Sequence, residues 1–290
     1  MISIFDIFKI GIGPSSSHTV GPMKAAAAFA DLLHAENLDT QVARIVIEVY
    51  GSLALTGIGH GTFDALLLGL EGSLPHDIPL ADIPQRLERI RTQHVLKLNG
   101  REMAFNPEKD LDIRGDKVLP KHPNGLNFIA YHSDGRKLKE QIYYSVGGGF
   151  VVTDEGFAQE AQENADVPYP YKNCDELLAQ CRLNQLNISE VVLANEAALA
   201  GCDEAEVRRR VAAVADVMEN CIKRGLGAEG QLPGGLNVRR RAPQLAAKLK
   251  VLRESEIVNT QLWPMVYAMA VNEENAAGGR VVTAPTNGAA

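Results

Sequence analysis

The amino-acid sequence predicts an α+β fold, with a mixed α/β domain at residues 1–155, a linker at 156–173 and a mostly helical domain at 174–290. Three observations support this prediction. Runs rich in β-branched residues, which are typical of strands, occur before residue 155. The segment that follows is polar and then interrupted by prolines, as at a domain boundary. Beyond it, apolar residues recur at spacings of three and four, which indicates helices.

The composition is that of an ordinary globular protein. The chain has 290 residues, enough for two domains, with 46% hydrophobic and 22% charged residues. Its net charge of −7 gives no global attraction for nucleic acid. It contains neither an apolar run of about 18 residues nor a signal peptide, so we expect no membrane partner and a cytoplasmic location.

Local patterns predict the elements of the first domain. Pro22 suits the first position of a helix that continues through 23–35. The run 41–51 is typical of a strand, and 63–72 of a helix. Asp134-Gly135 separates two strand-like runs and predicts a hairpin with a two-residue turn.

The second domain is predicted to be helical throughout. Ser189 and Asp203 are the expected N-caps of two of its helices. The four cysteines form no CxxC pair, so we interpret them as structural thiols and expect no metal ligands among them. The predicted helices span 174–186, 189–200, 203–226, 241–255 and 256–275. The cysteines are Cys174, Cys181, Cys202 and Cys221.

The sequence closes on RVVTAPTNGAA, residues 280–290. This segment predicts a strand, then a loop rich in Thr, Asn and Gly, and then two alanines that open a helix. We therefore expect the helical domain to be truncated and the chain to be the front part of a longer polypeptide.

The stretch GIGPSSSHTVGPM, residues 11–23, concentrates short hydroxyl side chains around His18. Since Pro22 predicts a helix start, these residues lie where free backbone N–H groups and the helix dipole favour an anion. Ser15, Ser16, Ser17 and Thr19 are therefore candidates for binding a carboxylate or phosphate. The alternative is that they only cap the helix and form turns.

Three further loops carry similar chemistry. His60 lies between glycines in TGIGHG, and His122 and Asn124 lie in KHPNG. The closing loop TAPTNG offers Thr283, Thr286 and Asn287. The remaining histidines do not lie in loops of this kind and are interpreted as structural; they are His34, His76, His94 and His132.

One alternative uses a lysine. Phe8-Lys9-Ile10-Gly11 resembles the lysine motif of pyridoxal-phosphate dehydratases, and the SVGGGF at 145–150 resembles their phosphate loop. Lys9 would then form the Schiff base. The GGG follows a predicted hairpin strand and opens no clear helix, which weighs against this interpretation. A mononucleotide P-loop is excluded because the sequence has no GxxxxGK[ST].

Four motifs together, GIGPSSSHTVGPMKAA, TGIGHGTFDA, KHPNGLNF and ENAAGGRVVTAPTNGAA, closely resemble the bacterial single-chain iron–sulfur L-serine dehydratases. The resemblance implies a [4Fe–4S] enzyme that converts L-serine to pyruvate and ammonia, with an iron acting as Lewis acid on the serine hydroxyl. In that family the cluster cysteines follow the PTNGA motif. The resemblance therefore places the ligands beyond Ala290 and implies that this chain is inactive alone.

The resemblance also implies roles for the loops. His122, His60 and His18 become candidates for the base that takes the Cα proton, with His122 ranked first because Asn124 could orient its ring. The serine-rich loop and Thr283 to Asn287 become the residues that hold the substrate. A homodimer is one assembly that a member of this family could form. Outside the resemblance, a non-catalytic amino-acid-binding module stays open as an alternative.

Overall fold

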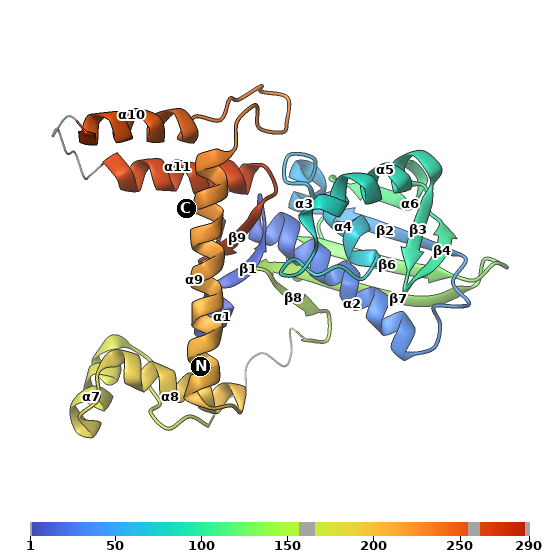
Figure 1. The fold of residues 1–290 in the computed structure, drawn as a ribbon. Coiled ribbons are helices and arrows are strands. Elements are labelled where there is room, and N and C mark those ends of the chain that lie inside the picture. The colour runs from blue at the N-terminus through green and yellow to red at the C-terminus, as the bar shows by residue number, and fades with distance from the viewer. Residues whose placement is uncertain (1, 157–165, 255–261, 288–290) are drawn as a thin grey trace.

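The computed structural model describes residues 2–156, 166–254 and 262–287. A sheet-containing amino-terminal part is followed by a mostly helical part, as the sequence predicts (Figure 1). The alanines at 289 and 290, where the sequence predicts a helix start, lie outside the described residues.

A five-stranded sheet forms the centre of the amino-terminal part, in the order β5-β2-β6-β7-β8. β2 and β5 are parallel, and the other neighbours are antiparallel. The strands are β2 (Arg44–Tyr50), β5 (Leu111–Arg114), β6 (Gly125–Tyr131), β7 (Lys137–Gly147) and β8 (Phe150–Thr153).

This topology gathers several chain ends at one edge of the sheet. β2 pairs Val49 with Leu126, so the end of β2 lies beside the start of β6. Gly125 pairs with Tyr144, which brings the end of β7 to the same edge. The segments that follow Tyr50, precede Gly125 and follow Tyr144 therefore meet, although they are far apart in sequence.

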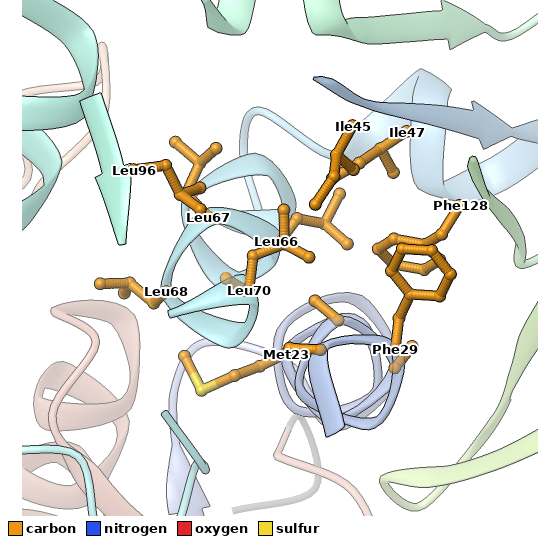
Figure 2. Packing of buried hydrophobic residues seen from close by; sticks show 14 of the residues in the cluster. Met23, Phe29, Ile45, Ile47, Leu66, Leu67, Leu68, Leu70, Leu96 and Phe128 are labelled. Atoms are coloured by element: carbon orange, nitrogen blue, oxygen red, sulfur yellow. The ribbon is translucent and has the colours of Figure 1, made fainter. Parts of the chain in front are cut away.

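Two helices, α2 (Gly21–Ala35) and α4 (Thr62–Leu70), build the main core with the sheet. Phe29 of α2 stacks on Phe128 of β6, with ring centroids 5.2 Å apart (Figure 2). α2 and α4 approach closely at Gly69, where an added Cβ would lie 2.3 Å from the carbonyl oxygen of Met23. This packing fixes the start of α2, and with it the serine-rich loop.

Short elements complete this part of the chain. The π-helical turn η1 (Ser16–Val20) runs directly into α2. The others are α1 (Ile4–Ile7), β1 (Lys9–Ile12), α3 (Gly51–Thr56), η2 (Leu80–Asp82), α5 (Ile83–Gln93), the paired β3 (Val95–Leu98) and β4 (Arg101–Ala104), and α6 (Pro107–Asp110).

The predicted hairpin exists between β6 and β7, but its turn differs from the prediction. The Gly135 N–H donates to the His132 carbonyl, and the His132 N–H donates to the Arg136 carbonyl. Ser133 and Asp134 are therefore the central turn residues, and Gly135 follows at a φ of 86°. The prediction of a two-residue turn at Asp134-Gly135 was wrong, because Gly135 supplies the left-handed residue that follows the turn.

Among the described residues of the second part, five helices follow, as predicted. Asp203 caps one of them, but the expected cap Ser189 was wrong. Asn187 is the cap there, because it forms a capping box with Glu190 and the helix begins one residue before Ser189. The helices are α7 (Cys174–Asn184), α8 (Ile188–Ala200), α9 (Glu204–Gly227), α10 (Ala242–Glu254) and α11 (Leu262–Ala276).

The two parts are joined by contacts between distant segments. β1 pairs antiparallel with β9 (Arg280–Thr283), in the register Lys9 with Thr283 and Ile12 with Arg280. The Ser3 hydroxyl donates to the Glu196 carboxylate of α8 at 2.6 Å. The first strand of the chain therefore belongs to a sheet with the last described strand.

Candidate functional site

The serine-rich loop is held as a tight turn by its own side chains. The Ser15 hydroxyl accepts a hydrogen bond from the His18 N–H at 3.1 Å and lies 3.4 Å from the Ser17 hydroxyl. Ser16 is buried. The backbone N–H groups of Ser16 and Ser17 donate to no other described residue. They leave two donors at the start of the turn, where a helix favours an anion.

The His18 ring lies between two serine hydroxyls. Its Nδ1 is 2.9 Å from the Ser17 hydroxyl, and its Nε2 is 3.0 Å from the Ser52 hydroxyl. A hydroxyl both donates and accepts, so this arrangement suits a neutral imidazole in either tautomer. The orientation of His18 is thereby fixed from two different segments of the chain.

The second loop is tied to the first through two threonines. The Thr19 hydroxyl donates to the His60 carbonyl, and the Thr62 hydroxyl donates to the His18 carbonyl, both at 2.7 Å. Thr19 and Thr62 are buried. As a result, the ring centroids of His18 and His60 lie 4.8 Å apart.

The tautomer of His60 follows from its partner. His60 Nδ1 lies 3.0 Å from the carbonyl oxygen of Thr56, which can only accept a hydrogen bond. Nδ1 therefore carries the proton. In the neutral ring, Nε2 is left with an unshared electron pair.

The third loop approaches the first through Ser145. The Ser145 hydroxyl donates to the Ser17 carbonyl at 2.7 Å, and the Asn124 side-chain amide donates to the Ser145 carbonyl at 3.1 Å. His122 Nδ1 accepts the Asn124 backbone N–H at 3.1 Å. A neutral His122 therefore carries its proton on Nε2, the opposite of His60. Asn124 orients this ring through its backbone, while its side-chain amide is used elsewhere.

The closing loop reaches the site through Asn275, and its three candidates differ. Asn287 is buried and donates to the Asn275 side-chain oxygen at 2.8 Å, while the Asn275 amide donates to the Pro14 carbonyl at 3.0 Å. Thr283 is also buried, but its hydroxyl bonds to the Lys9 carbonyl in the β1–β9 pair. Thr286 is exposed, and its side chain bonds to no other described residue. The structure thus brings Asn287 toward the serine-rich loop and turns the Thr283 hydroxyl to the backbone.

The electrostatics keep two histidines neutral near pH 7. Burial, followed by the nearby His60, lowers the pKa of His18, and the hydrogen bond with Ser52 offsets part of this. Burial alone lowers the pKa of His122. Both rings therefore form their hydrogen bonds as neutral groups.

Four contributors to the site were missed by the sequence reasoning: Ser52, Thr62, Ser145 and Asn275. Ser52 follows the predicted strand at 41–51, so its position at a strand end was a usable signal. Thr62 lies two residues beyond His60, in the quoted loop. Ser145 and Asn275 gave no local signal, because each reaches the serine-rich loop from more than 120 residues away.

The cysteines do not converge. Cys221 is buried in α9, where burial raises the pKa of its thiol, and Cys174 is exposed at the start of α7. Across residues 2–156, 166–254 and 262–287, the structure brings no three His, Cys, Asp or Glu side chains into a metal-binding group. The residues described here therefore do not fit the ligand set of a metal cluster. Within the same ranges, every helix is too short or too polar to cross a membrane.

Comparison with known proteins matches both parts of the chain. The family described as serine dehydratase beta chain matches residues 3–156, and that described as serine dehydratase alpha chain matches residues 183–290. L-serine dehydratase of Streptomyces coelicolor is 47% identical over 292 residues, and L-serine dehydratase 2 of Escherichia coli is 46% identical over 294. Each alignment covers 100% of this chain and 64% of the relative, so the chain spans less than two thirds of their length. The chain belongs to the serine dehydratase family.

Proposed function

We propose that this chain supplies the substrate site of an L-serine dehydratase, a lyase that converts L-serine to pyruvate and ammonia. The observation that carries the proposal is the convergence of His18 and His60, 4.8 Å apart, on a serine-rich turn with two backbone N–H groups that donate to no other described residue. The relatives named L-serine dehydratase, which align over the whole chain, support the choice of substrate.

The serine carboxylate binds at the turn in this proposal. The backbone N–H groups of Ser16 and Ser17 point from the start of η1, where the helix dipole adds to their attraction for a negative charge. The Ser15 and Ser17 hydroxyls lie beside them. Thr19 acts by holding the loops together, because its hydroxyl is already bonded to the His60 carbonyl. Asn287 positions the turn from the other side through Asn275.

His60 takes the Cα proton in this mechanism. Its Nδ1–H is held by the Thr56 carbonyl, so its Nε2 is the basic atom. The Nε2 of a neutral His122 carries a proton and suits donation. As the base, the geometry thus favours His60, whereas the sequence analysis ranked His122 first for this role. His18, with both nitrogens bonded to serine hydroxyls, orients its neighbours.

Removal of the Cα proton and of the β-hydroxyl yields aminoacrylate. This enamine tautomerises to an imine, and the imine hydrolyses in water to pyruvate and ammonia. The residues of this chain are needed only for the first stage, in which serine is bound, oriented and deprotonated.

An iron–sulfur cluster remains the proposed cofactor of the whole protein, as the resemblance implies. Because the described cysteines do not gather, we propose that its ligands lie outside residues 1–290 and that this chain alone is inactive. The cytoplasmic location, the homodimer and the division into domains at 155 and 174 stay predictions.

Reconstitution tests this proposal. With iron and sulfide under anaerobic conditions, we expect residues 1–290 to form no stable cluster and to release no pyruvate from L-serine. The complete protein should acquire a cluster absorbance and release pyruvate and ammonia in equal amounts. A stoichiometric cluster in the 290-residue chain that is lost in Cys181→Ser would place the ligands inside the chain. A loaded complete protein without serine deaminase activity would refute the function.

Ser17→Ala tests the substrate-binding turn. The change removes the hydroxyl that contacts His18 Nδ1 and Ser15, and a hydrogen bond that supports a charged group contributes about 1.5 to 3 kcal/mol. We expect the KM for L-serine to rise about tenfold or more in the complete protein, and Ser17→Thr to restore it partly. Ser133→Ala is the matched control, because Ser133 also adjoins a histidine Nδ1 but lies in the exposed β6–β7 turn. Unchanged KM and kcat in Ser17→Ala would reduce the turn to a helix cap.

A further inference from the structure

A second hollow lies away from the candidate site, between the start of the chain and α9. Its volume is about 640 Å³, within the range of small-molecule pockets. Figure 1 shows α9 running past α1 and β1, whose residues form the opposite wall. Four positively charged side chains line this cavity: Lys9, Lys24, Arg209 and Arg210.

The two lysines on the amino-terminal wall are poorly neutralised. Lys9 Nζ lies 3.1 Å from the ring centroid of Phe150 and 3.9 Å from the Asp6 carboxylate. Lys24 Nζ donates to the Gly149 carbonyl at 3.2 Å. Asp6 is the one acidic residue that lines the cavity among the described residues, and it serves both lysines. Burial and the charge of Lys24 lower the pKa of Lys9 to about 8, which agrees with an excess of positive charge.

The opposite wall carries the two arginines of α9. Both bind Glu206, Arg209 through Nε at 2.7 Å and Arg210 through Nε at 2.9 Å. Nη1 and Nη2 of Arg210 bond to no other described residue, so this guanidinium keeps an edge that matches a carboxylate. Apolar side chains also line the cavity, among them Phe8 on the amino-terminal wall and Ala213 and Val214 on α9.

We propose that this cavity binds a small organic dianion, with one carboxylate at Lys9 and Lys24 and the other at Arg210. The four cations face two carboxylates, Asp6 and Glu206, which leaves two positive charges for a ligand. The apolar side chains suit a short hydrocarbon spacer between the two acidic groups. The site is separate from the serine-rich turn, so the proposal does not depend on the proposed function.

Succinate is the probe for this site, and titration calorimetry of the complete protein is the measurement. We expect saturable binding of succinate at constant ionic strength and none of its neutral analogue succinamide. Lys24→Gln and Arg210→Gln should each weaken succinate binding about tenfold or more. Lys172→Gln removes an exposed lysine outside the cavity and should leave it unchanged. Equal succinate affinity in all variants, or no binding at all, would overturn the proposal.

Chemical labelling of Lys9 gives a second readout that does not rely on variants. The unprotonated amine reacts with an acetylating reagent, and a bound carboxylate favours the protonated form. At pH 8 we expect succinate to slow acetylation of Lys9 several-fold, measured by mass spectrometry, while Lys172 reacts as before. An unchanged rate at Lys9 under saturating succinate would also contradict the site. If Lys24→Gln fails to fold, Arg210→Gln and the labelling of Lys9 still test whether succinate binds in this cavity.

Discussion

Replacing His60 by asparagine is expected to lower kcat for L-serine deamination by about 10² to 10⁴ in the complete protein, the usual contribution of a general base. The asparagine amide can still donate to the Thr56 carbonyl as Nδ1 does, so the loop is retained and the basic Nε2 alone is lost. The KM should change little, because a base that acts in the transition state does not hold bound serine. Exchange of the serine Cα hydrogen with solvent, followed in D₂O by NMR, should stop as well.

Two comparisons make this result specific. His94→Asn is the matched control, because His94 is the C-cap that follows α5 at a φ of 56°, a conformation that asparagine tolerates. We expect wild-type kcat for it. His122→Asn should reduce kcat less than His60→Asn and leave Cα exchange intact. If His122→Asn abolishes exchange and His60→Asn retains it, His122 is the base, as the sequence ranking had it.

Our proposal ranks His60 above His122 as the base, and this difference from the sequence ranking rests on information that the sequence does not carry. Both histidines occur in glycine- and proline-rich loops, and Asn124 beside His122 suggested an oriented ring. The proposal rests on whether the Nδ1 atom of each histidine faces a hydrogen-bond acceptor, as in His60, or a donor, as in His122. The Thr56 carbonyl that fixes His60 is set by the backbone of α3 and the loop after it, which residue types do not reveal.

Elements whose signals are local were predicted well. The strand at β2 and the helices α2, α4 and α7 to α11 follow from runs of β-branched residues and from apolar spacing. The predictions were wrong where two neighbouring residues could each be the helix cap or the central turn residue. Asn187 and Ser189 are both good caps, and the reciprocal bond with Glu190 decides for Asn187. At the hairpin, Gly135 supplied a positive φ just after the turn that Asp134-Gly135 was expected to form.

Contacts between distant segments were beyond the sequence reasoning. The run RVV at 280–282 was expected to be a strand, but its partner β1 lies about 270 residues earlier and has no complementary signal. The same pairing brings Gly279 against Gly13, whose N–H donates to the Gly279 carbonyl at 3.1 Å. The serine-rich turn therefore depends for its position on residues at the other end of the chain.

Gly13→Ala tests that dependence and is expected to destabilise the protein by about 3 kcal/mol, near the upper end for overpacking. A Cβ at Gly13 would lie 1.9 Å from the backbone oxygen of Asn275 and 2.6 Å from its side-chain oxygen. Since the nearer atom belongs to the backbone of α11, no side-chain rotation relieves the clash. Thermal unfolding should shift down by about 6 to 12 °C, given about 2 to 4 °C per kcal/mol for a domain of this size.

The same variant should impair serine binding, which separates it from a purely structural defect. Moving Gly13 away from Asn275 breaks the hydrogen bond that the Asn275 side-chain amide donates to the Pro14 carbonyl. The turn that begins at Ser15 then loses this support. We therefore expect Gly13→Ala to raise the KM for L-serine at temperatures where the protein is still folded. Gly227→Ala is the control, since an added Cβ at the end of α9 meets no atom within 4 Å. If Gly13→Ala unfolds like Gly227→Ala and binds serine normally, the contact between Gly13 and Asn275 does not set the geometry of the turn.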